Sequence, residues 1–82
     1  MNLDEVIQEM DETLSDPSTP ARIKRALEKI STDLKEKNPD TAIKVTTAIY
    51  ELEEVVDDIN IPMHSKTMLW DLISDLESIK EE

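Results

Sequence analysis

The segment from Pro62 to Trp70 contains the single histidine and the single tryptophan of this 82-residue chain. An imidazole can transfer a proton near neutral pH or ligate a metal. Ser65 follows His64 directly, and a hydroxyl beside an imidazole could act as a nucleophile with its base. Because residues one apart on a helix point in different directions, we do not expect His64 and Ser65 to form a catalytic dyad. We expect Trp70, like Met63 two turns before it, to pack at the edge of the apolar stripe rather than to stack on nucleic-acid bases.

Carboxylates are the second group that could do chemistry, since paired acidic residues in a helical bundle can bind two metal ions. That design needs inward glutamates and Glu-x-x-His motifs, which one histidine cannot supply. The lack of cysteine and glycine excludes thiolate sites, P-loops and dinucleotide-binding loops. Four carboxylates project opposite Leu52 and Val56, at about 100° per residue, where we expect solvent: Glu53, Glu54, Asp57 and Asp58. We therefore predict no enzymatic activity, no cofactor and no metal site.

Four apolar segments would position these residues, and each has the i, i+3, i+4, i+7 spacing of an amphipathic helix. We predict helices over residues 3–15, 20–37, 40–58 and 62–80, within one domain over residues 1–82. Thr19 should cap the second helix, with Pro20 in its first turn. The third helix should bury a stripe from Ala42 to Ile59. Because short connections make consecutive helices antiparallel, the predicted fold class is all-α, an up-and-down four-helix bundle.

The two halves of the chain match without a gap after a shift of 42 residues. VIQEMDETLSD then lies over AIYELEEVVDD, Pro20 over Pro62 and Leu27 over Leu69. The identities exceed those expected from average composition, although shared apolar periodicity contributes to them. We interpret the bundle as two pseudo-equivalent helical hairpins.

The net charge of −11 comes from 20 acidic and 9 basic side chains and repels nucleic acid and anionic membranes. In an up-and-down bundle, the starts of the second and fourth helices meet the acidic ends of the first and third. That end gathers Arg22, Lys24, Arg25, His64 and Lys66. Either each cation group neutralises the acidic end of the preceding helix, or the group holds an anion or a partner at the helix N-termini.

A second candidate site is the back of the third helix, about 160–180° from Leu52, where charge is scarce. It consists of Ile43, Thr46, Thr47 and Tyr50. Isolated surface hydrophobes need no explanation, whereas a contact face would use tyrosine as interface cores do. In a symmetric homodimer the strip would meet itself, with Lys44 pairing with Glu51 or Glu54 of the second copy.

Three motifs are distinctive. They are Pro20-x-x-Ile23-x-Arg25-Ala26, Ala48-Ile49, and Pro62-Met63-His64-Ser65-Lys66-Thr67 leading to Trp70 and then Leu76-Glu77-Ser78-Ile79. With these motifs the chain resembles the small archaeal Uncharacterised Protein Family 0147 over essentially its whole length. The resemblance implies a helical bundle with no assigned activity, cofactor or ligand.

We therefore expect a cytoplasmic, non-enzymatic module for protein–protein interaction or assembly, whose partner is another protein or a second copy. The alternative is a nucleic-acid or ribonucleoprotein-associated factor that uses the basic start of the second helix. A small-molecule bundle enzyme ranks last. No apolar run approaches the ~18 residues that span a bilayer, and the acidic segment MNLDEV lacks the basic region of a signal peptide, so we expect no membrane association.

Overall fold

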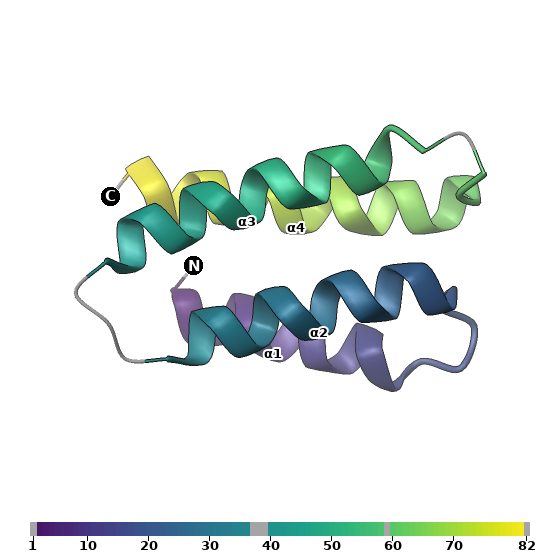
Figure 1. Cartoon of the computed structure of the whole chain (residues 1–82), viewed down its shortest axis with the longest axis horizontal. Coiled ribbons are helices and arrows are strands. Elements are labelled where there is room, and N and C mark those ends of the chain that lie inside the picture. The colour runs from purple at the N-terminus through teal and green to yellow at the C-terminus, as the bar shows by residue number, and fades with distance from the viewer. Residues whose placement is uncertain (1, 37–39, 59, 82) are drawn as a thin grey trace.

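The computed structural model describes residues 2–36, 40–58 and 60–81, and within these ranges it contains four α-helices and no strand (Figure 1). The helices are α1 (Leu3–Ser15), α2 (Ala21–Lys35), α3 (Thr41–Val56) and α4 (Met63–Glu81). α1 packs on α2, α2 on α3 and α3 on α4, and α4 closes the ring against α1. The predicted all-α, up-and-down four-helix bundle is therefore confirmed.

The helix bounds follow from local signals and lie within two residues of the predicted ones. The side chain of Asn2 caps α1 by accepting the backbone N–H of Glu5 at 2.9 Å. Residue 37, the predicted end of the second helix, lies outside the described residues, as does Ile59. No helix in the described part of the chain is both long and apolar enough to cross a membrane.

The predicted cap of α2 is wrong. Pro20 itself occupies the N-cap position, without a side-chain cap hydrogen bond, so Thr19 lies one residue too early to cap the helix. The buried Thr19 hydroxyl instead donates to the carbonyl of Thr13 at 3.0 Å. This bond ties the turn back to the last turn of α1.

The two hairpin turns are built alike, as the 42-residue repeat requires. The Asp16 carboxylate accepts the N–H of Ser18 at 2.9 Å, and the Asp58 carboxylate accepts the N–H of Asn60 at 2.9 Å. In both turns, the N–H three residues after the aspartate donates to the aspartate carbonyl, at 3.1 and 3.3 Å. The α1–α2 and α3–α4 hairpins are therefore pseudo-equivalent down to their turn hydrogen bonds.

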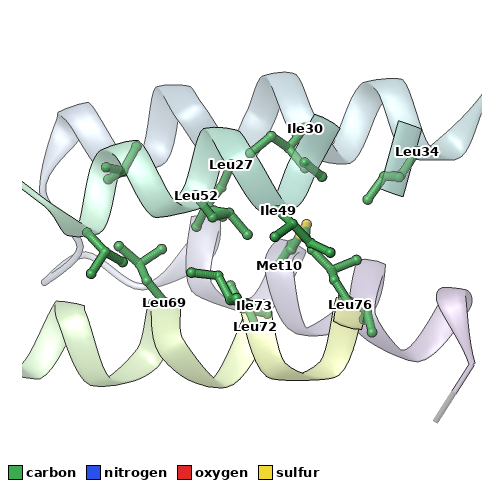
Figure 2. Close-up of a cluster of buried hydrophobic side chains, with 14 of the residues drawn as sticks. Met10, Leu27, Ile30, Leu34, Ile49, Leu52, Leu69, Leu72, Ile73 and Leu76 are labelled. Atoms are coloured by element: carbon green, nitrogen blue, oxygen red, sulfur yellow. The ribbon is translucent and has the colours of Figure 1, made fainter. Parts of the chain in front are cut away.

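The core runs along the bundle axis and receives apolar side chains from all four helices (Figure 2). Pseudo-equivalent residues share their burial, and Leu27 and Leu69 are both fully buried. Ala42 is exposed although we expected it in the core. It lies about 80° from Leu52 around α3, outside the face that packs against the other helices.

Candidate partner-binding face

Both hairpin turns lie at one end of the bundle, where Arg22 and Asp58 form an ion pair (Figure 1). The Asp58 side chain is 11% exposed and the Arg22 side chain 60%, so the guanidinium covers a carboxylate that is largely withdrawn from water. Arg22 lies in the first turn of α2, and Asp58 follows α3. The pair therefore joins the two hairpins.

Asp16 stands at the position of the first hairpin that corresponds to Asp58. The pKa of Asp16 lies below its usual value chiefly because Ser18 donates its N–H (2.9 Å) and its hydroxyl (2.7 Å) to the carboxylate, with smaller electrostatic contributions from His64 and Lys24. His64 in turn corresponds to Arg22. Arg22 and His64 therefore each lie near the aspartate of the other hairpin, whereas Lys24 lies near Asp16, at the end of the helix that precedes its own.

The five residues of the predicted basic group differ in their surroundings. Arg22 pairs with Asp58, and Lys24 and His64 lie close enough to Asp16 to contribute to its lowered pKa. Arg25 is exposed on the side of α2, where it lines a shallow depression with Glu28 and other α2 residues. Lys66 is half-buried in the first turn of α4. Of this predicted group, Arg22 is the residue that forms an ion pair within the described part of the chain.

The predicted strip on the back of α3 lies largely in solvent. Ile43 is 65% exposed and Tyr50 is 63% exposed, and Thr47 is exposed between them. Thr46 is half-buried and donates its hydroxyl to the carbonyl of Ala42 at 3.1 Å. A groove of about 270 Å³ towards α2 contains Ile43 and Thr47, and one of about 330 Å³ towards α4 contains Thr46 and Tyr50.

Lys44, at the edge of this strip, is bound within the chain rather than left for a second copy. Its ammonium lies 3.0 Å from the carboxylate of Glu36 and donates to the carbonyl of Asp33 at 3.1 Å. The C-terminal end of α2 attracts a cation because its last carbonyls carry partial negative charge. Glu51, the expected partner across a dimer, pairs with Lys29 at 3.2 Å.

The expectation that Met63 and Trp70 pack at the edge of the bundle is wrong. Met63 is 75% exposed and Trp70 is 55% exposed. Both lie more than about 100° from the centre of the buried face of α4, so neither reaches the core. The sequence did not predict their exposure, because a residue beside an apolar stripe is covered or exposed depending on where the neighbouring helix lies.

Met63 and Trp70 lie on the side of the second hairpin that also carries Tyr50. Glu77 lines the α3–α4 groove together with Tyr50. Trp70 and Met63 precede Glu77 by one and two heptads, a spacing that drifts by only about 20° per heptad around a helix. We define the α3–α4 face as the outer surface of this hairpin that carries Ile43, Thr46, Thr47, Tyr50, Met63 and Trp70.

The carboxylates beside this face differ from their counterparts in the first hairpin. There, Asp11 pairs with Lys35 at 3.0 Å, and the hydrogen bonds from Lys35 and from the hydroxyl of Ser31 lower the pKa of Asp11. The residues 42 positions later are Glu53 and Glu77, and both line the α3–α4 groove. An ion pair between α1 and α2 is thus replaced by two like charges between α3 and α4.

An acidic groove of about 500 Å³ between α1 and α4 was also missed. Glu9, Glu12, Asp71 and Asp75 line it. Partial burial, a hydrogen bond with Asp75 and the surrounding negative charges raise the pKa of Glu9. In the sequence, the groove appears only as two pairs of acidic residues at helical spacing. These pairs are far apart in the chain. Within the described residues, no three His, Cys, Asp or Glu side chains are arranged to hold a metal ion.

Two repeated hairpins with an exposed apolar face on one of them define a small all-α bundle protein. The chain belongs to the Uncharacterised Protein Family 0147 (UPF0147), whose family model matches residues 1–79. The UPF0147 protein of Methanothermobacter thermautotrophicus is 38% identical over 68 residues, covering 83% of this chain and 67% of the relative. That of Archaeoglobus fulgidus is 34% identical over 83 residues, covering 98% and 91%.

The predicted resemblance to this archaeal family is confirmed. No solved structure matches the chain. The name of the family assigns it no activity, so the comparisons identify relatives without stating what they do.

Proposed function

We propose that this protein is a non-enzymatic, cytoplasmic module for protein–protein interaction or assembly that acts through the α3–α4 face. One observation carries the proposal: the large, exposed hydrophobic side chains of the described residues all lie on α3 and α4. They are Ile43, Tyr50, Met63 and Trp70. Tyrosine and tryptophan are the residue types that contribute most to binding energy in protein interfaces.

The first hairpin provides an internal reference for this surface. Gln8, Ala21 and Glu28 stand where the second hairpin has Tyr50, Met63 and Trp70. The counterpart of Ile43 is Met1, which lies outside the described residues. Because the same helical positions accept polar or small residues in one hairpin, the bundle itself does not require large apolar side chains there. Their presence in the other hairpin favours a covering partner.

The alternative, a nucleic-acid or ribonucleoprotein-associated factor, has less support. It would use the basic start of α2, where Arg22 is already paired with Asp58 and Arg25 points along the side of the helix. A chain of net charge −11 would also pay a long-range electrostatic cost near a polyanion. RNA binding with a steep dependence on salt concentration, lost in Arg22→Ala, would favour this alternative.

The proposal is tested with the full chain as bait in extracts of the native cells. We compare the wild type with Tyr50→Lys and with Gln8→Lys, which makes the same change at the corresponding position of the first hairpin. Proteins that are captured by the wild type and by Gln8→Lys, but not by Tyr50→Lys, are the expected result by quantitative mass spectrometry. If no captured protein depends on Tyr50, the proposed function is wrong.

A further inference from the structure

The α3–α4 face also indicates what kind of partner it fits, an inference that rests on the proposed function. We propose that this face binds a basic amphipathic helix of another protein, rather than a second copy of this chain. The spacing of the apolar residues and the negative charge around them support this partner.

The apolar residues are spaced as a helical ligand requires. Ile43 and Tyr50 are seven residues apart on α3, and so are Met63 and Trp70 on α4. At a rise of about 1.5 Å per residue, each pair spans about 10 Å along its helix. An amphipathic helix presents apolar side chains at i, i+3, i+4 and i+7, which repeat over the same distance. Of these four residues, Tyr50 lines the groove of about 330 Å³ between α3 and α4, which gives such a helix a concave seat beside the other three.

The negative charge beside the groove favours a ligand that carries positive charge. Glu53 and Glu77 line it, at the positions where the first hairpin has the Asp11–Lys35 pair. Lys80 also lines this groove, so one internal cation accompanies two carboxylates. Glu54 near the end of α3 and Asp57 just after it are exposed and form no ion pair within the described residues. Lysine or arginine side chains at the edge of a docked helix would complement these carboxylates.

The same charge argues against a second copy. A two-fold symmetric interface brings each patch against itself, so the carboxylates of one copy would face those of the other. Residues 38–82 contain eleven acidic and three basic side chains, a net charge of −8, whereas residues 1–37 carry −3. Lys44, which could have offset the repulsion, is already bound to Glu36 and to the carbonyl of Asp33.

The test uses a synthetic 18-residue peptide of leucine and lysine, with leucine at the i, i+3, i+4, i+7 positions of a helix. Trp70 is the single tryptophan of the mixture and therefore reports on the face directly. We expect its fluorescence to shift to shorter wavelength and saturate, with amide shifts concentrated on the outer sides of α3 and α4. A peptide with the same composition in scrambled order, and one with glutamate in place of lysine, should give neither response.

The sharpest variant is Glu77→Lys, which recreates opposite Glu53 the ion pair of the first hairpin. It should weaken binding of the basic peptide by about tenfold or more, while the stability of the bundle is retained or increased. The matched control, Lys35→Glu, removes the Asp11 pair and should lower stability while leaving peptide binding unchanged. Tyr50→Lys should also weaken binding about tenfold, and Gln8→Lys should not.

Three results would overturn the inference: equal binding of the scrambled peptide, equal loss in Gln8→Lys and Tyr50→Lys, or preference for the glutamate peptide. A Tyr50-dependent doubling of mass by light scattering would assign the face to a second copy, which keeps the interaction function but rejects this partner. Peptide binding without any Tyr50-dependent capture from native extracts would instead reject the proposed function.

Discussion

The α1–α2 and α3–α4 hairpins share their turns and their buried positions, yet their outer surfaces differ. Leu27 and Leu69 occupy equivalent places in the core, whereas Gln8 and Tyr50 occupy equivalent places outside it. Close packing limits which side chains fit in the core, so the repeat is retained at core positions. Core packing does not restrict the outer positions. Differences there between the two hairpins therefore relate to the surroundings of each hairpin.

The ionic interactions divide the molecule in the same way. The ion pairs within the described residues each involve α2 or Glu36 just after it, and they bind α2 to both of its neighbours. In the part of the chain that the structure describes, Glu53 and Glu77 on the outer side of the second hairpin form no ion pair, and Lys80 lines the same groove. The Asp11–Lys35 ion pair of the first hairpin thus has no counterpart at the matching positions of the second, Glu53 and Glu77.

The largest expected effect tests whether the two hairpins are equivalent in the core. Leu27→Ala and Leu69→Ala should each lower the free energy of unfolding by about 2–5 kcal/mol, through lost burial and a residual cavity. Urea denaturation measures both, and we expect the two losses to agree within about 1 kcal/mol. If an alanine variant does not fold, Leu→Met at the same positions, with a cost below about 1.5 kcal/mol, allows the comparison. A strong asymmetry would contradict equivalent core roles.

The next effect compares the Arg22–Asp58 ion pair with the equivalent positions His64 and Asp16 at the charged end. Arg22→Ala leaves the nearly buried Asp58 carboxylate without its cation and should cost about 1 kcal/mol, between the values for surface and buried pairs. His64→Ala removes an exposed group near an exposed aspartate and should have a smaller effect, because solvent screens their interaction. A double-mutant cycle with Asp58→Ala isolates the first contribution. Additive losses in that cycle would show that the pair contributes nothing.

Smaller effects of opposite sign should appear with pH. The lowered pKa of Asp16 means that its charge stabilises the fold above its unfolded-state pKa, and that this contribution is lost as pH falls through its folded-state pKa. The raised pKa of Glu9 means that its ionisation costs stability as pH rises through its folded-state pKa.

Compared with the wild type, Asp16→Asn should therefore be less stable at pH 7, and Glu9→Gln more stable. Both differences should shrink as the carboxyl groups become protonated in acid, and thermal unfolding over a pH series measures them. Differences of the same sign at pH 7, or a gap that widens in acid, would contradict the electrostatic interpretation.

The smallest expected effect concerns the outer face and bears most directly on function. Tyr50→Lys and Gln8→Lys should each change the free energy of unfolding by no more than about 0.5 kcal/mol, because both positions lie in solvent. Urea denaturation of the isolated protein provides the measurement. A large loss in Tyr50→Lys would show that Tyr50 supports the fold, and the contrast between the hairpins would then have a structural cause.

The four helices, their antiparallel order and the 42-residue repeat could all be predicted from the sequence. Apolar spacing and proline positions are local signals, and short connections leave few ways to arrange four helices. The strip of Ile43 and Tyr50 was also predictable, because its angle from Leu52 is a property of α3 alone.

Only the tertiary structure decided which residues meet across helices. Arg22 reaches Asp58, and Lys44 reaches Glu36, because of how the hairpins dock and not because of any spacing within one segment. The exposure of Trp70 and the gathering of Glu9 with Asp75 have the same origin. Periodicity gives the angle of a residue around its own helix, but contact also depends on the rotation and depth of the neighbouring helix, which are set by packing of the whole core.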